Sequence, residues 1–294
     1  MTESVPTRGS LRSRSAALLS MTTLRQISAV LPPEQPWGLW LSRQIVSGIM
    51  DGFGPSLAGA RTESVDVHHD GRRVVGEWVR ARGVSTGRGA IYFVHGSGFA
   101  LCSPRTHRRL TSWLSQLTGL PVFAIDYRLA PRHRFPTAAD DVRAGWDWLT
   151  AQVPAEHVVI AGDSAGGHLS VDLLLQPDVA ANGPAAVVLF SPLIDLTLEL
   201  ARACEDFRRD PAIRAADAPA WFGSTAPAST PHTTGSNSMS PVGRRCLRHS
   251  SRPVAQRCCS PMRGIWPPTF APAAAVASCR FGRTRCTSFR RCPG

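Results

Sequence analysis

Residues 157–175 read HVVIAGDSAGGHLSVDLLL, a short apolar run, a tight polar turn and a second apolar run. The first run, at 157–163, has the length and continuous apolar character of a buried strand. The second run predicts a helix around 165–176. The turn between them carries G-D-S-A-G, which is the G-x-S-x-G pattern in a strand–turn–helix context. This arrangement predicts a sharp bend that lifts Ser164 off the sheet at the start of a helix.

Three more short apolar runs alternate with helical segments around 106–118 and 137–151. The three apolar runs are AIYFVH at 90–95, PVFAIDY at 121–127 and AAVVLFS at 185–191. Continuous apolar strands that alternate with helices are buried on both faces, which indicates a mostly parallel sheet with helices packed on each side. The fold class is therefore α/β, and the chemistry is expected at the carboxyl ends of the strands.

The chain before residue 90 predicts a helix and a hairpin. SVDVHH and VVGEWVRA are β-rich runs on either side of Asp70-Gly71, a dipeptide that closes tight hairpins. From about Leu31 to Phe53, apolar residues recur at helical spacing and predict an amphipathic helix that faces the core. These residues are Trp37, Leu39, Trp40, Leu41, Ile45, Val46, Ile49 and Met50.

The motif around Ser164 predicts nucleophilic chemistry. Gly162 and Gly166 keep the positions two before and two after the serine small, as the tight turn requires, while Asp163 and Ala165 complete the motif. A serine hydroxyl exposed in this way can attack a carbonyl carbon. The alternative is a Gly-rich turn that cradles phosphate, but the chain lacks G-x-G-x-x-G and a downstream G-K-[ST].

A second motif can supply the donors that such an attack needs. HGSGF, from His95 to Phe99, directly follows the run AIYFV. Attack on a carbonyl creates an oxyanion, which fixed N–H donors stabilise in a site of low dielectric constant. The backbone N–H groups of Ser97, Gly98 and Ala165 are therefore predicted to form an oxyanion hole. Small residues such as Gly96 allow the consecutive backbone N–H groups of the loop to turn inward. Taken alone, HGSG also fits an ordinary turn at a strand end.

Two further motifs complete a family pattern. DYRLAP stands at 126–131, FP at 135–136, two aspartates at 140–141, and SPLIDLT at 191–197. In this order the chain resembles the hormone-sensitive-lipase family of α/β-hydrolase esterases. That family carries H-G-G-G-[FW], D-Y-R-L-A-P-E-x-x-[FY]-P-A-x-x-D-D, G-D-S-A-G-G and S-P-x-x-D-L-[ST].

The resemblance implies an α/β-hydrolase fold in which the N-terminal helix is a cap over the acyl site; plain core packing is an equal alternative for that helix. It implies hydrolysis of short- to medium-chain acyl esters through an acyl-enzyme on Ser164, without a cofactor or metal. His95 would orient the oxyanion loop and would not be the catalytic base, and Tyr127 and Arg128 would be framework residues. Ser97 replaces a family glycine and adds a side chain that can narrow the acyl pocket.

The composition changes after residue 217. Residues 1–217 hold 22 arginines and all 21 acidic residues, whereas residues 218–294 hold 11 arginines, no acid and six of the eight cysteines. The net charge of +12 is therefore a property of the tail and not of the hydrolase-like part. The tail also has one Leu, one Ile and 10 Pro, too little apolar surface to offset the entropy of ordering it. We divide the chain into a cap region at 1–60, an incomplete hydrolase core at 61–217 and an irregular tail at 218–294.

The catalytic partners of Ser164 are missing from the sequence. In this fold the acid and the histidine of the triad follow the serine along the chain. The tail has no acid, and its histidines, His232 and His249, follow no predicted strand. Asp195 and Glu199 lie too close to SPLIDLT to be the family's acid. Neither a triad acid nor a triad histidine can be assigned, which predicts little or no turnover and an exposed, poorly soluble sheet edge.

Out-of-frame translation explains such a tail. The test is to read the gene in codons that begin one base earlier. In that frame, the bases that encode residues 261–276, PMRGIWPPTFAPAAAV, could encode DARHLAADIRAGGGS. This second sequence is typical of the helix that opens after the catalytic acid in the family. The same shift permits Glu across Gln256/Arg257 and allows only His or Tyr across Cys286/Thr287. These matches, in the family's order, lead to the hypothesis of a frame change near Asp217–Trp221.

A natural basic extension is the alternative. Its arginines could contact nucleic-acid phosphates while aromatic residues stack on bases, which makes nucleic-acid binding the second functional class. Those aromatic residues are Trp266, Phe270, Phe281 and Phe289. The cysteine spacings contain no C-x-x-C pair, which argues against a zinc site.

The remaining expectations concern location and partners. The chain has no apolar run of 18 residues or more, and SAALLS near its start is too short for a secretory signal. We therefore expect a cytoplasmic protein whose partner is a small acyl ester, with no metal, membrane or nucleic acid bound.

Overall fold

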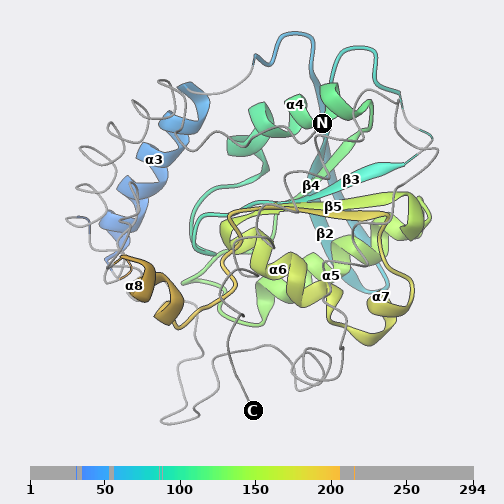
Figure 1. Cartoon of the computed structure of the whole chain (residues 1–294). Coiled ribbons are helices and arrows are strands. Elements are labelled where there is room, and N and C mark those ends of the chain that lie inside the picture. The colour runs from blue at the N-terminus through green and yellow to red at the C-terminus, as the bar shows by residue number, and fades with distance from the viewer. Residues whose placement is uncertain are drawn as a thin grey trace, which may run out of the picture.

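The computed structural model describes residues 31, 35–52, 56–85, 87, 89–205 and 215. Within this part of the chain, six strands form one sheet in the order β1-β2-β4-β3-β5-β6 (Figure 1). The strands β4, β3, β5 and β6 run parallel, whereas β2 is antiparallel to both β1 and β4. The sheet is therefore mostly parallel, as the sequence predicts. The strands are β1 (Arg61–His69), β2 (Arg72–Arg80), β3 (Ala90–Val94), β4 (Val122–Ile125), β5 (Val158–Asp163) and β6 (Ala186–Phe190).

Helices cover both faces of this sheet. One face carries α4, and the other carries α5 and α6, with α7 beyond them (Figure 1). The helices are α3 (Pro36–Gly52), α4 (Arg108–Thr118), α5 (Thr137–Thr150), α6 (Ser164–Leu174), α7 (Pro177–Ala181) and α8 (Glu199–Glu205), with 3-10 turns η1 (Pro104–His107) and η2 (Ala155–His157). The three-layer arrangement confirms the predicted fold class.

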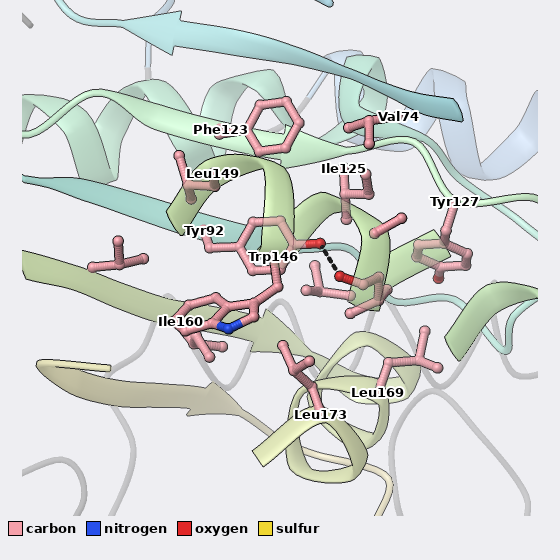
Figure 2. Packing of buried hydrophobic residues seen from close by; sticks show 14 of the residues in the cluster. Val74, Tyr92, Phe123, Ile125, Tyr127, Trp146, Leu149, Ile160, Leu169 and Leu173 are labelled. Carbon is pink, nitrogen blue, oxygen red and sulfur yellow. Dashed lines mark hydrogen bonds between the residues drawn. The ribbon is translucent and has the colours of Figure 1, made fainter. Parts of the chain in front are cut away.

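The central strands alternate between the two helix layers. Along β3, Ile91 and Phe93 pack in the cluster under α4, whereas Tyr92 and Val94 pack in the cluster with α5 and α6. All five residues of β3 are buried, because helices lie on both faces. In Figure 2 the ring of Tyr92 lies between Trp146 and Phe123, and its hydroxyl donates to the carbonyl of Val142 at 2.7 Å. This packing fixes β3 and β5, whose carboxyl ends carry the two motifs.

The predicted hairpin is confirmed. β1 and β2 pair from Arg61–Arg80 to His69–Arg72, so Asp70 and Gly71 form the two-residue turn. Both have positive φ, 48° and 73°, the backbone that such a turn requires. β2 continues into the sheet by pairing with β4 and not with β3, its neighbour in sequence.

The N-terminal helix differs from its prediction at two residues. α3 buries Leu39 against a small apolar cluster formed by Ala100, Leu101 and Cys102 from the loop after β3 and by Ala130 from the segment after β4. Trp37 and Trp40 are 58% and 61% exposed, so assigning them to the core-facing stripe was wrong. The physical reason is that α3 packs on a loop through a narrow face, which leaves the tryptophan side of the helix outside.

The last strand also differs from its prediction. All five residues of β6 are only half-buried, so the expectation of a strand buried on both faces is wrong here. β6 is the end strand of the sheet among the described residues and pairs with β5 alone there. The expectations for residues 1–30 and for the tail after residue 217 lie outside the described residues.

Candidate active site

The predicted bend at Ser164 is present. β5 ends at Asp163 and α6 begins at Ser164, whose φ of 47° is in the left-handed region. A non-glycine residue pays about 1–2 kcal/mol for that backbone, so the surrounding structure must hold it there. Gly166 allows the tight packing, because a Cβ at this position would collide with the carbonyl oxygens of Val94 and His95 at the end of β3. The bend therefore sits directly against the start of the HGSG loop.

The loop from His95 to Phe99 is held by its neighbours at three points. The Tyr127 hydroxyl donates to the His95 carbonyl at 2.7 Å, and the Gly96 amide donates to Asp163 Oδ1 at 3.0 Å. The amide of Ala130 donates to the Phe99 carbonyl at 3.0 Å. These contacts fix the loop from two sides, the segment after β4 and the bend at Ser164.

Three amides near Ser164 remain available for a ligand. Within the described part of the chain, the N–H groups of Ser97 and Gly98 donate to no protein group. The N–H of Ala165 lies in the first turn of α6, where helical amides have no partner within the helix. These are the three donors for which the sequence predicts an oxyanion hole.

Asp163 connects the bend to the loop. Besides accepting from the Gly96 amide, its Oδ1 lies 3.4 Å from Nε2 of His107. His107 is buried, with 2% of its side chain exposed, and its Nδ1 lies 3.0 Å from Thr106 Oγ1. Sequence reasoning assigned no role to His107, since a single histidine before a helix carries no signal that separates it from an ordinary core residue.

His95 is a buried neutral side chain. Its ring stacks on Tyr127 with centroids 4.2 Å apart, and its Nδ1 lies 3.1 Å from the Gly96 carbonyl oxygen. Burial, with the nearby His107 as a second cause, lowers its pKa to about 3. These contacts are compatible with the loop-orienting role that the resemblance implies for His95. The framework role predicted for Tyr127 and Arg128 is compatible with their contacts: Tyr127 stacks on His95, and the Arg128 guanidinium pairs with Asp141 at 2.7 Å.

The side chain of Ser97 accepts a hydrogen bond from a neighbouring residue. The thiol of Cys102 donates to Ser97 Oγ at 2.9 Å. Both residues have positive φ, 77° for Ser97 and 65° for Cys102. Whether the serine narrows the acyl pocket stays a prediction; its hydroxyl is bonded to the turn that follows the loop.

No base for Ser164 is found in the described residues. These hold seven of the nine histidines, and no hydrogen bond in that part of the chain joins any of them to the serine. His168, one turn along α6, has its Nδ1 2.9 Å from the Leu193 carbonyl oxygen. Asp195 accepts from Thr197 and from the Leu200 amide in a local turn. His232 and His249 lie outside the described residues.

The described residues contain neither a metal-binding cluster nor a membrane-spanning helix. No group of three or more His, Cys, Asp or Glu side chains is placed there to hold a metal ion. No helix in that part is both long enough and apolar enough to span a bilayer.

The sequence comparisons agree with the geometry. A profile for the alpha/beta hydrolase fold matches residues 91–252, more than half of the chain, and runs past residue 217. The chain is 40% identical over 122 residues to the carboxylesterase/phospholipase LipF of Mycobacterium tuberculosis, which is 40% of this chain and 33% of LipF. It is 33% identical over 116 residues to the human hormone-sensitive lipase, which is 37% of this chain and 11% of that protein. The chain belongs to the hormone-sensitive-lipase family of α/β-hydrolases.

A solved structure supports the fold of this hormone-sensitive-lipase relative. The crystal structure of an esterase from the bacterial hormone-sensitive lipase family matches with a TM-score of 0.60 and 24% identity, over 80% of this chain and 73% of that chain. At this identity the likeness concerns the fold alone. The matched region spans about a third of the length of LipF.

Proposed function

We propose that the chain is built for carboxylic-ester hydrolysis with Ser164 as the nucleophile. One observation carries the proposal: Ser164 is held at a left-handed bend against a loop in which the Ser97 and Gly98 amides have no protein partner among the described residues. A strained serine next to a loop whose amides have no protein partner among the described residues suits acyl transfer better than simple packing.

The reaction follows from these groups. The Ser164 oxygen attacks the acyl carbon of the ester, and the carbonyl oxygen becomes an oxyanion that the amides of Ser97, Gly98 and Ala165 stabilise. The Ser164 hydroxyl releases its proton to water during the attack. Collapse of the intermediate breaks the ester bond, and the leaving alkoxide takes a proton from water to depart as the alcohol. Water then attacks the acyl-enzyme, which releases the carboxylic acid and restores the serine hydroxyl.

The expected turnover of this chain is low. A serine hydroxyl is a weak nucleophile unless a histidine accepts its proton. Since no such histidine is found among the described residues, we expect Ser164 to attack without a base to activate it. The oxyanion hole and substrate binding would then supply the acceleration, about 10³–10⁴-fold over water.

The proposed substrates are small acyl esters with short to medium chains. The support comes from relatives named as a carboxylesterase/phospholipase and as an ethyl acetate hydrolase, the latter of Pseudomonas putida at 38% identity over 115 residues. The proposed reaction needs no metal or cofactor, since a carbonyl is activated here by backbone amides.

The tail is proposed to be an out-of-frame remainder of the same family, with the frame change near Asp217–Trp221. This would account for a fold with a nucleophile and no assigned base. Sequencing the gene tests it directly: an early stop or the lack of any family-like segment in the shifted frame would rule it out.

A p-nitrophenyl ester assay tests the proposed function. We expect slow hydrolysis by the purified chain that Ser164→Ala abolishes, and at least about 10³-fold faster hydrolysis after the frame is restored. Equal rates for the purified chain and Ser164→Ala, together with no gain on restoring the frame, would refute the proposal. Equal rates for the present and restored chains, both dependent on Ser164, would refute only the claim of low turnover.

A further inference from the structure

The oxyanion loop contains a residue that its backbone does not favour. Ser97 stands at φ 77°, a conformation that glycine adopts without strain and that other residues adopt only when neighbours hold them. The sequence resemblance places a glycine here in related chains. Something in this protein must therefore hold the serine in place.

The turn that follows the loop supplies that hold. The Ser97 carbonyl accepts the amides of Ala100 and Leu101 at 3.3 and 3.1 Å, which closes a tight backbone turn. The thiol of Cys102 then reaches back to Ser97 Oγ at 2.9 Å. Cys102 is itself left-handed, at φ 65°, so the side-chain bond joins two strained residues across one turn.

Cys102 is anchored independently of Ser97. Its side chain is buried in the apolar cluster that Leu39 of α3 covers, together with Ala100, Leu101 and Ala130. Arg43 of the same helix donates to the Ala100 carbonyl at 2.8 and 3.0 Å. A thiol fixed by this packing can hold the Ser97 side chain and leave the Ser97 amide directed to the site.

The thiol is suited to donating a hydrogen bond. Burial raises the pKa of Cys102, so the side chain keeps its proton at neutral pH. A buried, protonated thiol is a weak nucleophile and an available donor.

We propose that Cys102 is a positioning residue of the oxyanion loop: its thiol holds Ser97 in the left-handed conformation that presents the Ser97 amide to the acyl oxygen. The role in hydrolysis rests on the proposed function, whereas the hold on Ser97 does not. The proposal makes the two side chains a coupled pair, so that the effect of removing the Cys102 thiol depends on which residue stands at position 97.

The alkylation rate of Cys102 tests the coupling between the two side chains and does not depend on enzyme activity. The rate at which iodoacetamide alkylates Cys102, followed by peptide mass spectrometry, is compared in the parent chain and in Ser97→Ala. We expect about fivefold faster alkylation in Ser97→Ala, the change that corresponds to a lost hydrogen bond of ordinary strength. The exposed Cys204 on α8 is the internal control, and its alkylation rate is expected to stay constant.

The kinetic test separates positioning from general stability. In Ser164-dependent p-nitrophenyl acetate hydrolysis, Cys102→Ala is expected to lower kcat about fivefold with KM unchanged, and Cys102→Ser to restore it by supplying a hydroxyl donor. In the Ser97→Gly background, Cys102→Ala is expected to change kcat less than about twofold, because glycine needs no tether. Cys204→Ala is the matched control and is expected to match the parent.

The outcomes distinguish the two proposals. Equal alkylation of Cys102 in the parent and Ser97→Ala overturns the inference, and so does an equal loss from Cys102→Ala in the parent and in the Ser97→Gly background. Faster alkylation in Ser97→Ala, with hydrolysis that neither Ser164→Ala lowers nor the restored frame raises, supports the hold on Ser97 and refutes the proposed function instead.

Discussion

Asp163→Ala is predicted to loosen the contact between the bend at Ser164 and the HGSG loop. In the folded chain, Asp163 Oδ1 accepts the Gly96 amide at 3.0 Å and lies 3.4 Å from His107 Nε2. The first contact is a hydrogen bond to a carboxylate, and the second is too long to add much. The substitution therefore removes one charge-assisted bond at the centre of the site.

The size of the effect follows from that bond. A hydrogen bond to a charged group contributes about 1.5–3 kcal/mol, and the Asp163 side chain is 24% exposed, so some solvent replaces the lost partner. We expect Asp163→Ala to lower the free energy of unfolding by about 2 kcal/mol. Asp163→Asn keeps an oxygen for the Gly96 amide without the charge and should cost about half as much.

Urea unfolding followed by tryptophan fluorescence measures the effect. Glu156→Ala removes the same charge from an exposed position and serves as the control, with a change expected within about 0.5 kcal/mol. The reasoning is refuted if Asp163→Ala lies within about 0.5 kcal/mol of the parent, the noise for surface changes. It is also refuted if Asp163→Asn costs as much as Asp163→Ala, since a retained acceptor would then be irrelevant.

Three more substitutions test the surroundings of the site. The pKa of His95 is about 3 in the fold and 6.5 ordinarily, so the unfolded chain binds more protons between these values. His95 should therefore make stability fall as pH drops below 6.5, by up to about 1.4 kcal/mol per pH unit. In urea unfolding, His95→Gln should remove this contribution of His95 to the slope, and exposed His68→Gln should keep it. Arg43→Ala removes the hydrogen bonds that join α3 to the Ala100 and Ala130 carbonyls, so it should speed hydrogen exchange of the α3 amides about tenfold. Gln44→Ala changes an exposed residue of the same helix and should not. Equal exchange in both variants would show that Arg43 does not anchor α3. Gly166→Ala should destabilise the chain by at least about 2 kcal/mol, because its methyl group meets backbone, and an unchanged melting temperature would show that the bend is not packed as described.

The local elements could be predicted because short-range sequence determines them. Asp70-Gly71 closes the hairpin through backbone angles that few other pairs adopt, and the run before Ser164 is a strand because its apolar residues are continuous. The bend could be predicted because G-x-S-x-G between an apolar run and a helical run is a local pattern of a strand–turn–helix unit. These features need no knowledge of the rest of the chain.

The contacts around the bend could not be predicted in that way. Asp163 meets Gly96, 67 residues earlier, only because β5 pairs with β3 in parallel and brings both carboxyl ends to one edge. His107, the last residue of η1, has its Nε2 3.4 Å from the same carboxylate, although it lies 56 residues before Asp163 in the chain. No pattern in the sequence near these residues encodes either partner.

The sequence by itself determined the six strands, the helices α3 to α6, the hairpin and the position of the candidate nucleophile, because each depends on residues close together in the chain. Only the tertiary structure decided that Trp37 and Trp40 face outward, that β2 lies beside β4, and that Cys102 holds Ser97. The physical reason is that these outcomes depend on which surfaces meet after the sheet has formed. A side chain's own periodicity cannot specify the surface that it will meet.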